Sequence, residues 1–442
     1  MAALIFFVPL LFDAILLVLQ GIKIYWSLEM KLVKNYFNKF IYHYNTDERL
    51  ITILAVSLFL PYPITAVTLV GIALFVLVKR DLLGMIKTMK STIFIIALAV
   101  YWLVVSLVFQ NYLGALISVG VFFIAIDIIY YRYVINKRLF QSILNIMVFM
   151  SLVALGYALF EQLSYHLELN TSSYFTISNS ANHRVHTFFY NANYYSLMIL
   201  FVECICVYKI LNNKKYPKLY ISVAVLNFFA IYLTGTRVAW LSLLITWLAM
   251  FIVARNKTAI FATISYGVTI IVSLIFKLPL IPRLVDYGAS LGRRQVIYDT
   301  ALLMIKDTWL FGRGPLTYYR FNQDYLQAYI AKYGTSQLND LGIASEHTHS
   351  LFLELPVSFG LIGTLIIGAY IGAQLRRIYY LGSLKIDKNI MILIIGIILV
   401  VITNNITDFN IFWIQTATTF FILLGSSDIY RREILEIKKP LL

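Results

Sequence analysis

The chain has 442 residues, of which 60% are hydrophobic and only 13% are charged. A soluble globular domain averages about 25% charged residues, so this composition excludes the soluble class and predicts an integral membrane protein. The formal net charge of +15 does not indicate a nucleic-acid partner, because most lysines and arginines lie in short loops between apolar runs. That placement follows the positive-inside rule and favours contact with anionic membrane lipids.

About twelve or thirteen apolar segments follow one another, which predicts an all-α polytopic membrane protein formed by a single membrane domain over residues 1–442. The first, near residues 2–20, lacks preceding basic residues and a clear cleavage site, so we interpret it as a retained helix. The next two, near 50–60 and 64–78, form either a shallow hairpin or one span kinked by prolines. The others lie near 91–109, 112–131, 140–160, 193–210, 219–234, 238–253, 258–276, 350–374, 389–405 and 411–425.

Basic residues mark every second loop, and this alternation predicts that these loops and the C-terminus are cytoplasmic. Two long loops then lie outside: a first outer loop over residues 161–192 and a large extracytoplasmic loop over residues 277–349. The large loop is rich in Leu, Ile, Tyr and Trp, so we expect it to be folded and to carry much of the active site. Within it, Arg293–Trp309 has the spacing of an amphipathic helix lying at the membrane surface. Its apolar positions are Ile297, Ala301, Ile305 and Trp309.

Arginines are frequent in the predicted outer segments, where the positive-inside rule disfavours them. Because the guanidinium group is a planar fork of donors that matches phosphate oxygens, we predict a diphosphate-binding site at the outer face. Ion pairing with neighbouring acidic residues remains open as the alternative for each arginine. Arg237 differs, because it ends an apolar segment with no acidic neighbour in sequence, and such residues are functional by default. The candidates are Arg184, Arg237, Arg293, Arg294 and Arg313.

Histidines also gather on the predicted outer side, where five of the six lie, His43 being the exception. His347 and His349 directly precede an apolar segment, and a histidine there suits a general base that activates a sugar hydroxyl. Two alternatives remain open. One is a structural histidine at a helix N-terminus, and the other is a metal site in which His183 and His186 converge with the later pair. No dense ligand motif supports a metal, so we expect none.

Motifs for other chemistry are missing from the sequence. It contains no Walker loop for ATP, no Asp-x-Asp pair for a metal–nucleotide sugar and no Gly-x-Ser-x-Gly elbow. An enzyme built here would use a donor that is already activated and embedded in lipid, without a cofactor. The alternative function is a transporter or flippase for an anionic solute or a lipid-linked sugar, which would favour charged or broken helices at mid-membrane. The predicted spans are nearly free of charge at their centres, and a non-catalytic assembly subunit also stays open.

Three patches of the sequence resemble the O-antigen ligase/polymerase family. Arg184–Asn193 is similar to the family's patch of an arginine followed by Asn-x-Asn, and Thr234–Trp240 (TGTRVAW) is similar to its Thr-Gly-Ser/Thr-Arg patch. The region from Arg293 through Phe311–Pro315 to His349 resembles the family's large outer loop, which runs from an arginine through a Gly-x-Gly turn to a histidine.

The resemblance implies a GT-C-like membrane glycosyltransferase in the bacterial inner membrane, with its active site on the periplasmic side. It implies a polyprenyl-diphosphate-linked glycan as donor, a glycan or lipid-core acceptor, and a polysaccharide chain-length regulator as a further partner. Arginines that match Arg237 and Arg293 or Arg294 would hold the diphosphate, and a histidine that matches His349 would serve the acceptor.

Two points stay open within this family. Ser350 follows the histidine where the family often has Asn, so either His347 or His349 could be the base. The family contains polymerases, whose acceptor is another lipid-linked repeat unit, and ligases, whose acceptor is a lipid A core or a protein. We slightly favour a polymerase.

Overall fold

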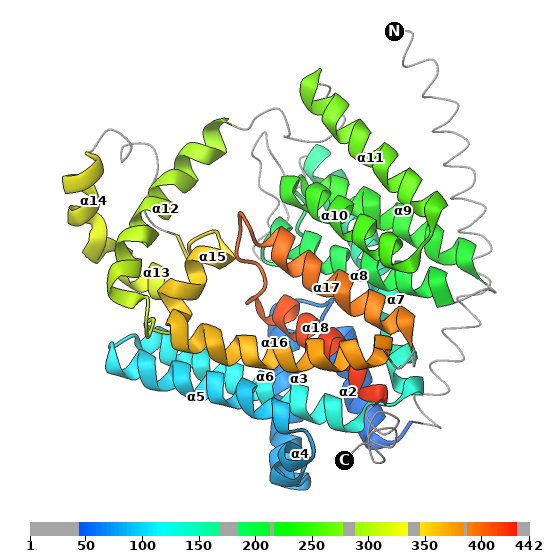
Figure 1. Ribbon diagram of the computed structural model, residues 1–442, viewed down its shortest axis with the longest axis horizontal. Helices are drawn as coiled ribbons and strands as arrows, with labels where there is room; N and C mark the ends of the chain where they lie inside the picture. Colours follow the sequence, from blue (N-terminus) through cyan, green and yellow to red (C-terminus); the bar gives the residue numbers. More distant parts are fainter. Residues whose placement is uncertain are drawn as a thin grey trace.

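The structure is a computed structural model that describes residues 44–167, 184–212, 216–276, 288–334, 345–383 and 387–430. All regular structure in these ranges is helical, which confirms the predicted all-α class. Most helices pack into one bundle, and a smaller group stands beside it (Figure 1). The first predicted apolar segment lies outside the described residues, as do His43 and His183.

Nine helices of the described chain are long and apolar enough to cross a bilayer, and their positions agree with the predicted segments. The chain is therefore a multi-pass membrane protein. Eight of these spans are α3 (Tyr62–Lys79), α5 (Ile93–Val108) after the turn η1 (Lys90–Thr92), α6 (Tyr112–Val134), α7 (Lys137–His166), α8 (Ala192–Asn212), α9 (Pro217–Thr234), α10 (Arg237–Ala254) and α11 (Lys257–Ile275). The ninth joins α15 (Leu351–Glu354), the π-helical turn η4 (Leu355–Phe359) and α16 (Gly360–Ser383).

Shorter helices complete the bundle. They are α2 (Thr46–Ser57), α4 (Leu82–Thr88), α17 (Lys388–Asn404), α18 (Ile414–Gly425) and η5 (Ser426–Tyr430). The 12 residues of α2 rise about 18 Å, less than the roughly 30 Å of a bilayer core. Asp47 pairs with Arg80, so α2 and α3 form a hairpin, the first of the two predicted alternatives. The turn of this hairpin contacts α18, because the Gln415 amide donates to the carbonyls of Leu58 and Leu60 at 3.2 and 2.6 Å.

The loops that are predicted to be cytoplasmic meet at one end of the bundle, which we call the basic end. Arg132 is fully buried there and donates to Asp428 at 2.6 Å, and Arg377 pairs with the other oxygen of that carboxylate. Arg138 pairs with Glu48 at the same end. The ends of the spans that lead into the predicted outer loops meet at the opposite end, which we call the histidine end.

Helix α8 forms the centre of the bundle, and 89% of its span is buried. It packs against α7, α9, α10, α17 and α18. Glu203 lies within this helix, fully buried, and neither of its carboxylate oxygens has a hydrogen-bond partner. The expectation that the span centres are nearly free of charge does not hold at this position.

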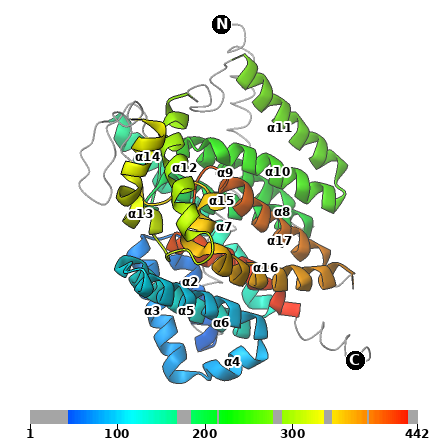
Figure 2. The same ribbon diagram turned by 60° about the vertical axis from the view of Figure 1, so that its left-hand side comes forward.

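The smaller group of helices stands beside the bundle and is built from the predicted large loop (Figures 1 and 2). It contains α12 (Gly288–Thr308), α13 (Thr317–Phe321), η3 (Asn322–Tyr325) and α14 (Leu326–Tyr333). Its core consists of Ile297, Ala301, Met304, Tyr318, Phe321 and Val357. The predicted amphipathic helix is therefore present, with Ile305 partly buried against this core, whereas Trp309 lies just beyond the helix and is 52% exposed.

Two glycines join this group to the bundle. Gly312 follows α12 and Gly360 begins α16, and both have a φ of +63°. A Cβ atom added to Gly312 would lie 2.4 Å from the carbonyl oxygen of Ser358, and one added to Gly360 would lie 2.4 Å from the Gly312 nitrogen. The Leu361 amide also donates to the Trp309 carbonyl at 2.7 Å. Only glycine fits both positions, since the left-handed backbone and the close crossing each exclude a side chain.

Gly360→Ala is expected to lower the melting temperature of the purified protein in detergent by several degrees, because the methyl group must push the two backbones apart. Gly368→Ala in the same helix is the matched control, since a Cβ atom there meets nothing within 4 Å. The control should keep or slightly raise the melting temperature, because alanine favours a helix over glycine. Equal melting temperatures for both variants would contradict the tight crossing.

Candidate functional site

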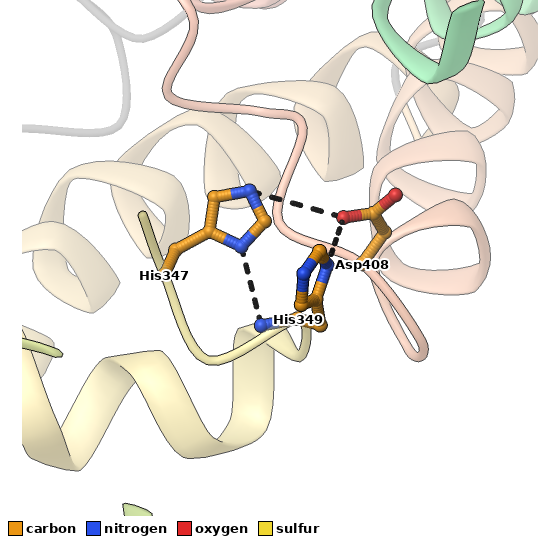
Figure 3. Close-up of side chains that lie close together, drawn as sticks. All are labelled: His347, His349 and Asp408. Carbon is orange, nitrogen blue, oxygen red and sulfur yellow. Dashed lines mark hydrogen bonds and ion pairs between the residues drawn. The ribbon is translucent and has the colours of Figure 1, made fainter. Parts of the chain in front are cut away.

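Two histidines and one aspartate come together at the histidine end (Figure 3). Nδ1 of His349 lies 3.1 Å from Oδ1 of Asp408, and Nε2 of His347 lies 3.9 Å from the same oxygen. The backbone N–H of His349 donates to Nδ1 of His347 at 3.2 Å. Asp408 belongs to the loop between α17 and α18, so the site joins two segments that are 59 residues apart in sequence.

The two histidines differ in what their ring nitrogens face. Both nitrogens of His347 point at protein groups, and burial lowers the pKa of this ring to about 4 despite the nearby Asp408, so it is neutral at neutral pH. His349 uses only Nδ1, towards Asp408, and its side chain is 29% exposed, against 14% for His347. Because an ionised carboxylate can only accept, Nδ1 of His349 carries the proton and Nε2 is left as an acceptor.

Asp408 is ionised. Burial alone would raise the pKa of its carboxyl group, but the hydrogen bond from His349, the two neighbouring imidazoles and the charge of Arg294 hold that pKa well below its usual range. An ionised carboxylate behind an imidazole fixes the tautomer and stabilises the ring once it takes up a proton. This pair can therefore accept a proton from a hydroxyl group placed at Nε2 of His349.

The short loop that carries the histidines is held in a strained shape. His349 has a φ of +52°, which is unfavourable for a residue with a side chain. Tyr298 of α12 donates its hydroxyl to the His349 carbonyl at 3.3 Å, and the buried Glu354 accepts the Thr348 backbone N–H at 3.0 Å. The Leu351 amide donates to the Asn405 carbonyl at the end of α17 at 2.9 Å. These bonds from three elements keep the imidazole beside Asp408.

The loop that carries Asp408 is supported by side-chain amides. Oδ1 of Asn405 accepts the backbone N–H groups of Asn410 and Ile411 at 2.6 and 3.1 Å, and Asn410 donates to Asn404 at 3.1 Å. Backbone away from water needs such partners, because an unpaired buried N–H is costly. The loop is therefore a built feature of the site and not a loose connector.

Arg184 takes part in an internal hydrogen-bond network. Its Nε donates to the Thr234 carbonyl at 2.9 Å, and its NH2 group donates to the Thr236 hydroxyl at 2.9 Å and to the Asn193 side chain. Asn193 in turn donates to Oδ2 of Asp408. Arg184 thus connects the turn between α9 and α10 to the carboxylate behind His349, and this internal role competes with a role in binding diphosphate.

The other predicted arginines lie at separate places. Arg237 is the first residue of α10, directly after the Gly235–Thr236 turn, and a helix N-terminus favours an anion. Arg294 precedes Tyr298 by one helical turn, so both lie on one face of α12, and the Arg294 charge acts on His347 and Asp408. The side chain of Arg293 lies outside the described atoms.

Arg313 is placed away from this network. Its guanidinium group lies over the rings of Phe109 and Phe321, at 5.4 and 4.9 Å from their centroids. Asn111 donates to the Arg313 carbonyl at 3.0 Å. These contacts fasten the end of α5 to the smaller helical group, and they give Arg313 a packing role at the joint.

The described histidines of the predicted metal alternative lie at two separate places. His186 lies 3.7 Å from Glu161 at the end of α7, and it is not part of the cluster that joins His347, His349 and Asp408. The ligand atoms of that cluster lie within 4.8 Å of one another. Two imidazoles and a carboxylate could hold a zinc ion, so the metal alternative now includes Asp408 and not His186, while His183 lies outside the described residues.

Comparison with known families identifies one domain of the chain. Residues 222–368 match the family model described as O-antigen ligase. The chain contains an O-antigen ligase domain. This match supports the resemblance of the chain to the O-antigen ligase/polymerase family, and that family suggests a glycosyl-transferring membrane enzyme with lipid-linked glycan substrates. No curated protein matches the chain.

The O-antigen ligase domain begins within α9 and ends within α16, so it includes Arg237, Arg294 and His349. Asn193 and Asp408 lie outside the matched residues, although they complete the hydrogen-bond network of His349. Sequence reasoning missed Asp408 as a site residue. The signal was the polar run Asn404–Asn410 between two apolar segments, which contains four amide or carboxylate side chains and turns the chain without any basic residue.

Proposed function

We propose that this O-antigen ligase domain protein transfers a polyprenyl-diphosphate-linked glycan to a sugar hydroxyl at the outer face of the bacterial inner membrane. The observation that carries the proposal is the His349–Asp408 pair, which leaves Nε2 of a partly exposed imidazole as the proton acceptor. Arg237 and Arg294 supply positive charge at the same end of the bundle. A base and cations together suit a reaction in which a hydroxyl attacks and a diphosphate leaves.

The reaction balances without a metal or a nucleotide. An acceptor hydroxyl gives its proton to Nε2 of His349, and its oxygen forms a bond to the anomeric carbon of the donor. The bond between that carbon and the diphosphate oxygen breaks, and the leaving group keeps the electron pair. Arg237 and Arg294 stabilise the negative charge that develops there, while Asp408 stabilises the imidazolium.

The decisive experiment incubates the purified protein with lipid-linked repeat units alone and separates the products by length. A ladder of products would indicate a polymerase, which we slightly favour. Transfer only after a lipid A core or a protein acceptor is added would indicate a ligase. If no acceptor yields a product from a donor that the protein binds, the proposed transfer is wrong, and the transporter or flippase function becomes the better one.

The membrane orientation is a separate prediction. Gln327→Cys in α14 should react with a membrane-impermeant maleimide added to intact cells, whereas Ser383→Cys at the basic end should react only after the membrane is opened. Both positions are exposed, and the native Cys204 and Cys206 are fully buried, so background labelling should be low. Labelling of Ser383→Cys alone in intact cells would place the histidine end in the cytoplasm and exclude a periplasmic active site.

A further inference from the structure

Three tyrosine rings gather on one tryptophan next to the candidate site. Trp413 stacks with Tyr194 at a centroid distance of 4.9 Å and with Tyr190 at 5.4 Å, with interplanar angles of 12° and 25°. Tyr62 meets the same indole edge-on at 5.3 Å. Three separate segments supply these rings: the start of α3, the region around the start of α8, and the loop before α18. We call Tyr62, Tyr190, Tyr194 and Trp413 the aromatic cluster.

The cluster is fixed from within the protein. The indole N–H of Trp413 donates to Gln415 at 3.0 Å, and Gln415 is bonded in turn to the turn after α2. Tyr194 is buried, Tyr62 and Trp413 are partly exposed, and Tyr190 is 59% exposed. The cluster is thus buried at Tyr194 and exposed at Tyr190, and its rings are held in place before any ligand arrives.

The cluster is continuous with the His349–Asp408 pair. Asp408 and Trp413 belong to the same loop, and Asn193, which donates to Asp408, directly precedes Tyr194. Tyr194 is close enough to Asp408 and Glu346 to be affected by both charges. A ligand that rests on the rings therefore lies beside the segments that position the base.

A fixed stack of rings with an exposed outer member, here Tyr190, suits a sugar. One face of a pyranose ring presents polarised C–H groups, which pack on the negative face of an aromatic ring. A belt of tyrosine and tryptophan at the membrane interface is the other common reason for such residues. Belt residues point their polar atoms at lipid headgroups and water, whereas the Trp413 N–H is bonded inside the protein and the rings stack on one another.

We propose that Tyr62, Tyr190 and Trp413 form a subsite that binds a pyranose ring of the acceptor glycan next to His349. This assignment rests on the proposed function for the identity of the acceptor. Trp413 lies in the same loop as Asp408, and Asp408 orients the imidazole that receives the proton of the acceptor. We therefore assign the aromatic cluster to the acceptor and not to the donor.

The test measures binding without turnover. The probe is a water-soluble oligosaccharide of a few repeat units, released by mild acid from the surface glycan of the source bacterium and titrated calorimetrically into the detergent-purified protein. Tyr190→Ala and Trp413→Ala should each weaken binding roughly tenfold, since a stacked aromatic contact is lost. Trp413→Phe should keep most of the affinity, because a ring remains.

Matched controls separate a subsite from general aromatic anchoring. Tyr232→Ala removes a tyrosine that is 40% exposed at the end of α9, and Trp309→Ala removes a tryptophan that is 52% exposed after α12. Both should bind the oligosaccharide as the parent does. Equal weakening in the controls, or unchanged binding by both Tyr190→Ala and Trp413→Ala, would overturn the subsite.

Kinetics then assign the substrate. The Tyr190→Ala protein, in which an exposed side chain is truncated and the fold is spared, should raise the KM for the acceptor while the donor KM stays constant. A rise in the donor KM alone would overturn the acceptor assignment. Oligosaccharide binding that depends on the cluster in a protein without transferase activity would refute the proposed function and leave the subsite standing.

Discussion

His349→Ala is expected to lower the rate of glycan transfer by about 10²–10⁴-fold, because the general base is lost. The variant should still bind the lipid-linked donor, since the arginines are unchanged. Transfer is measured from radiolabelled lipid-linked repeat units, and donor binding by co-purification. Activity equal to that of the parent would leave the arginines as the only catalytic candidates.

Three controls give this result its meaning. His186→Ala should keep most of the activity, because His186 pairs with Glu161 outside the cluster. Asp408→Asn should lower the transfer rate nearly as much as His349→Ala does, because the neutral amide can no longer stabilise the imidazolium. The transfer rate of His347→Ala should lie between those of His186→Ala and Asp408→Asn. This variant removes a buried neutral ring that accepts a hydrogen bond from the backbone N–H of His349.

Chelation tests the metal alternative directly. The cluster of His347, His349 and Asp408 has the ligand types and spacing of a zinc site, so metal removal has to be measured. EDTA is expected to leave the transfer rate unchanged, because a diphosphate leaving group can be stabilised by arginines alone. Loss of activity on chelation that one added metal restores would replace the general-base mechanism by a metal mechanism.

Arg237→Ala is expected to lower the transfer rate by orders of magnitude, about 10²–10³-fold, as removal of one charge-stabilising group does in other enzymes. The residue begins α10 after a left-handed Gly235, so in the proposed mechanism its charge and the helix N-terminus would stabilise the same diphosphate. Arg237→Lys should recover only part of the rate, since lysine lacks the planar fork. The effect is measured as the rate at saturating acceptor over a range of donor concentrations.

The matched control for Arg237 is Arg320→Ala, an exposed arginine of α13. It should change the rate little, because it removes the same charge at a distance from the network. A fully active Arg237→Lys variant would mean that only the charge matters, and a fully active Arg237→Ala variant would remove this residue from the site.

The fold could be predicted in large part because the membrane simplifies the physics. Apolar runs must be long enough to cross the bilayer, and their backbone must bond within itself, so hydropathy alone locates α5 to α11. The helix α12 was also predictable, since Ile297 and Ala301 repeat at helical spacing and both are buried. The α2–α3 pair was ambiguous, because proline permits a kink as well as a turn; the Asp47–Arg80 pair decides for a turn.

The site could be predicted only as a set of residue types. The sequence predicts Arg184 as a phosphate ligand because guanidinium groups suit phosphate. Its hydrogen-bond partners Thr234 and Thr236 lie 50 and 52 residues away, and no pattern in the sequence indicates that they contact Arg184. Asp408 was missed for the same reason, since its contact with His349 spans 59 residues. The choice between the two histidines likewise depends on ring orientation, which the chain order leaves undetermined.

The short helix α2 has a consequence for the length of the product. The turn that follows α2 contacts the start of α18 at about 18 Å from the basic end. Because a bilayer core is roughly 30 Å thick, this contact lies below the membrane surface at the histidine end. Trp413 and Asp408 belong to the loop that ends at this junction. In the proposed reaction, the acceptor end of a glycan has to reach His349 below that surface, while the remainder of the chain stays in water. The proposed transfer then involves the same few terminal sugars whether the polymer is short or long, so the reaction at His349 would not depend on the length of the product.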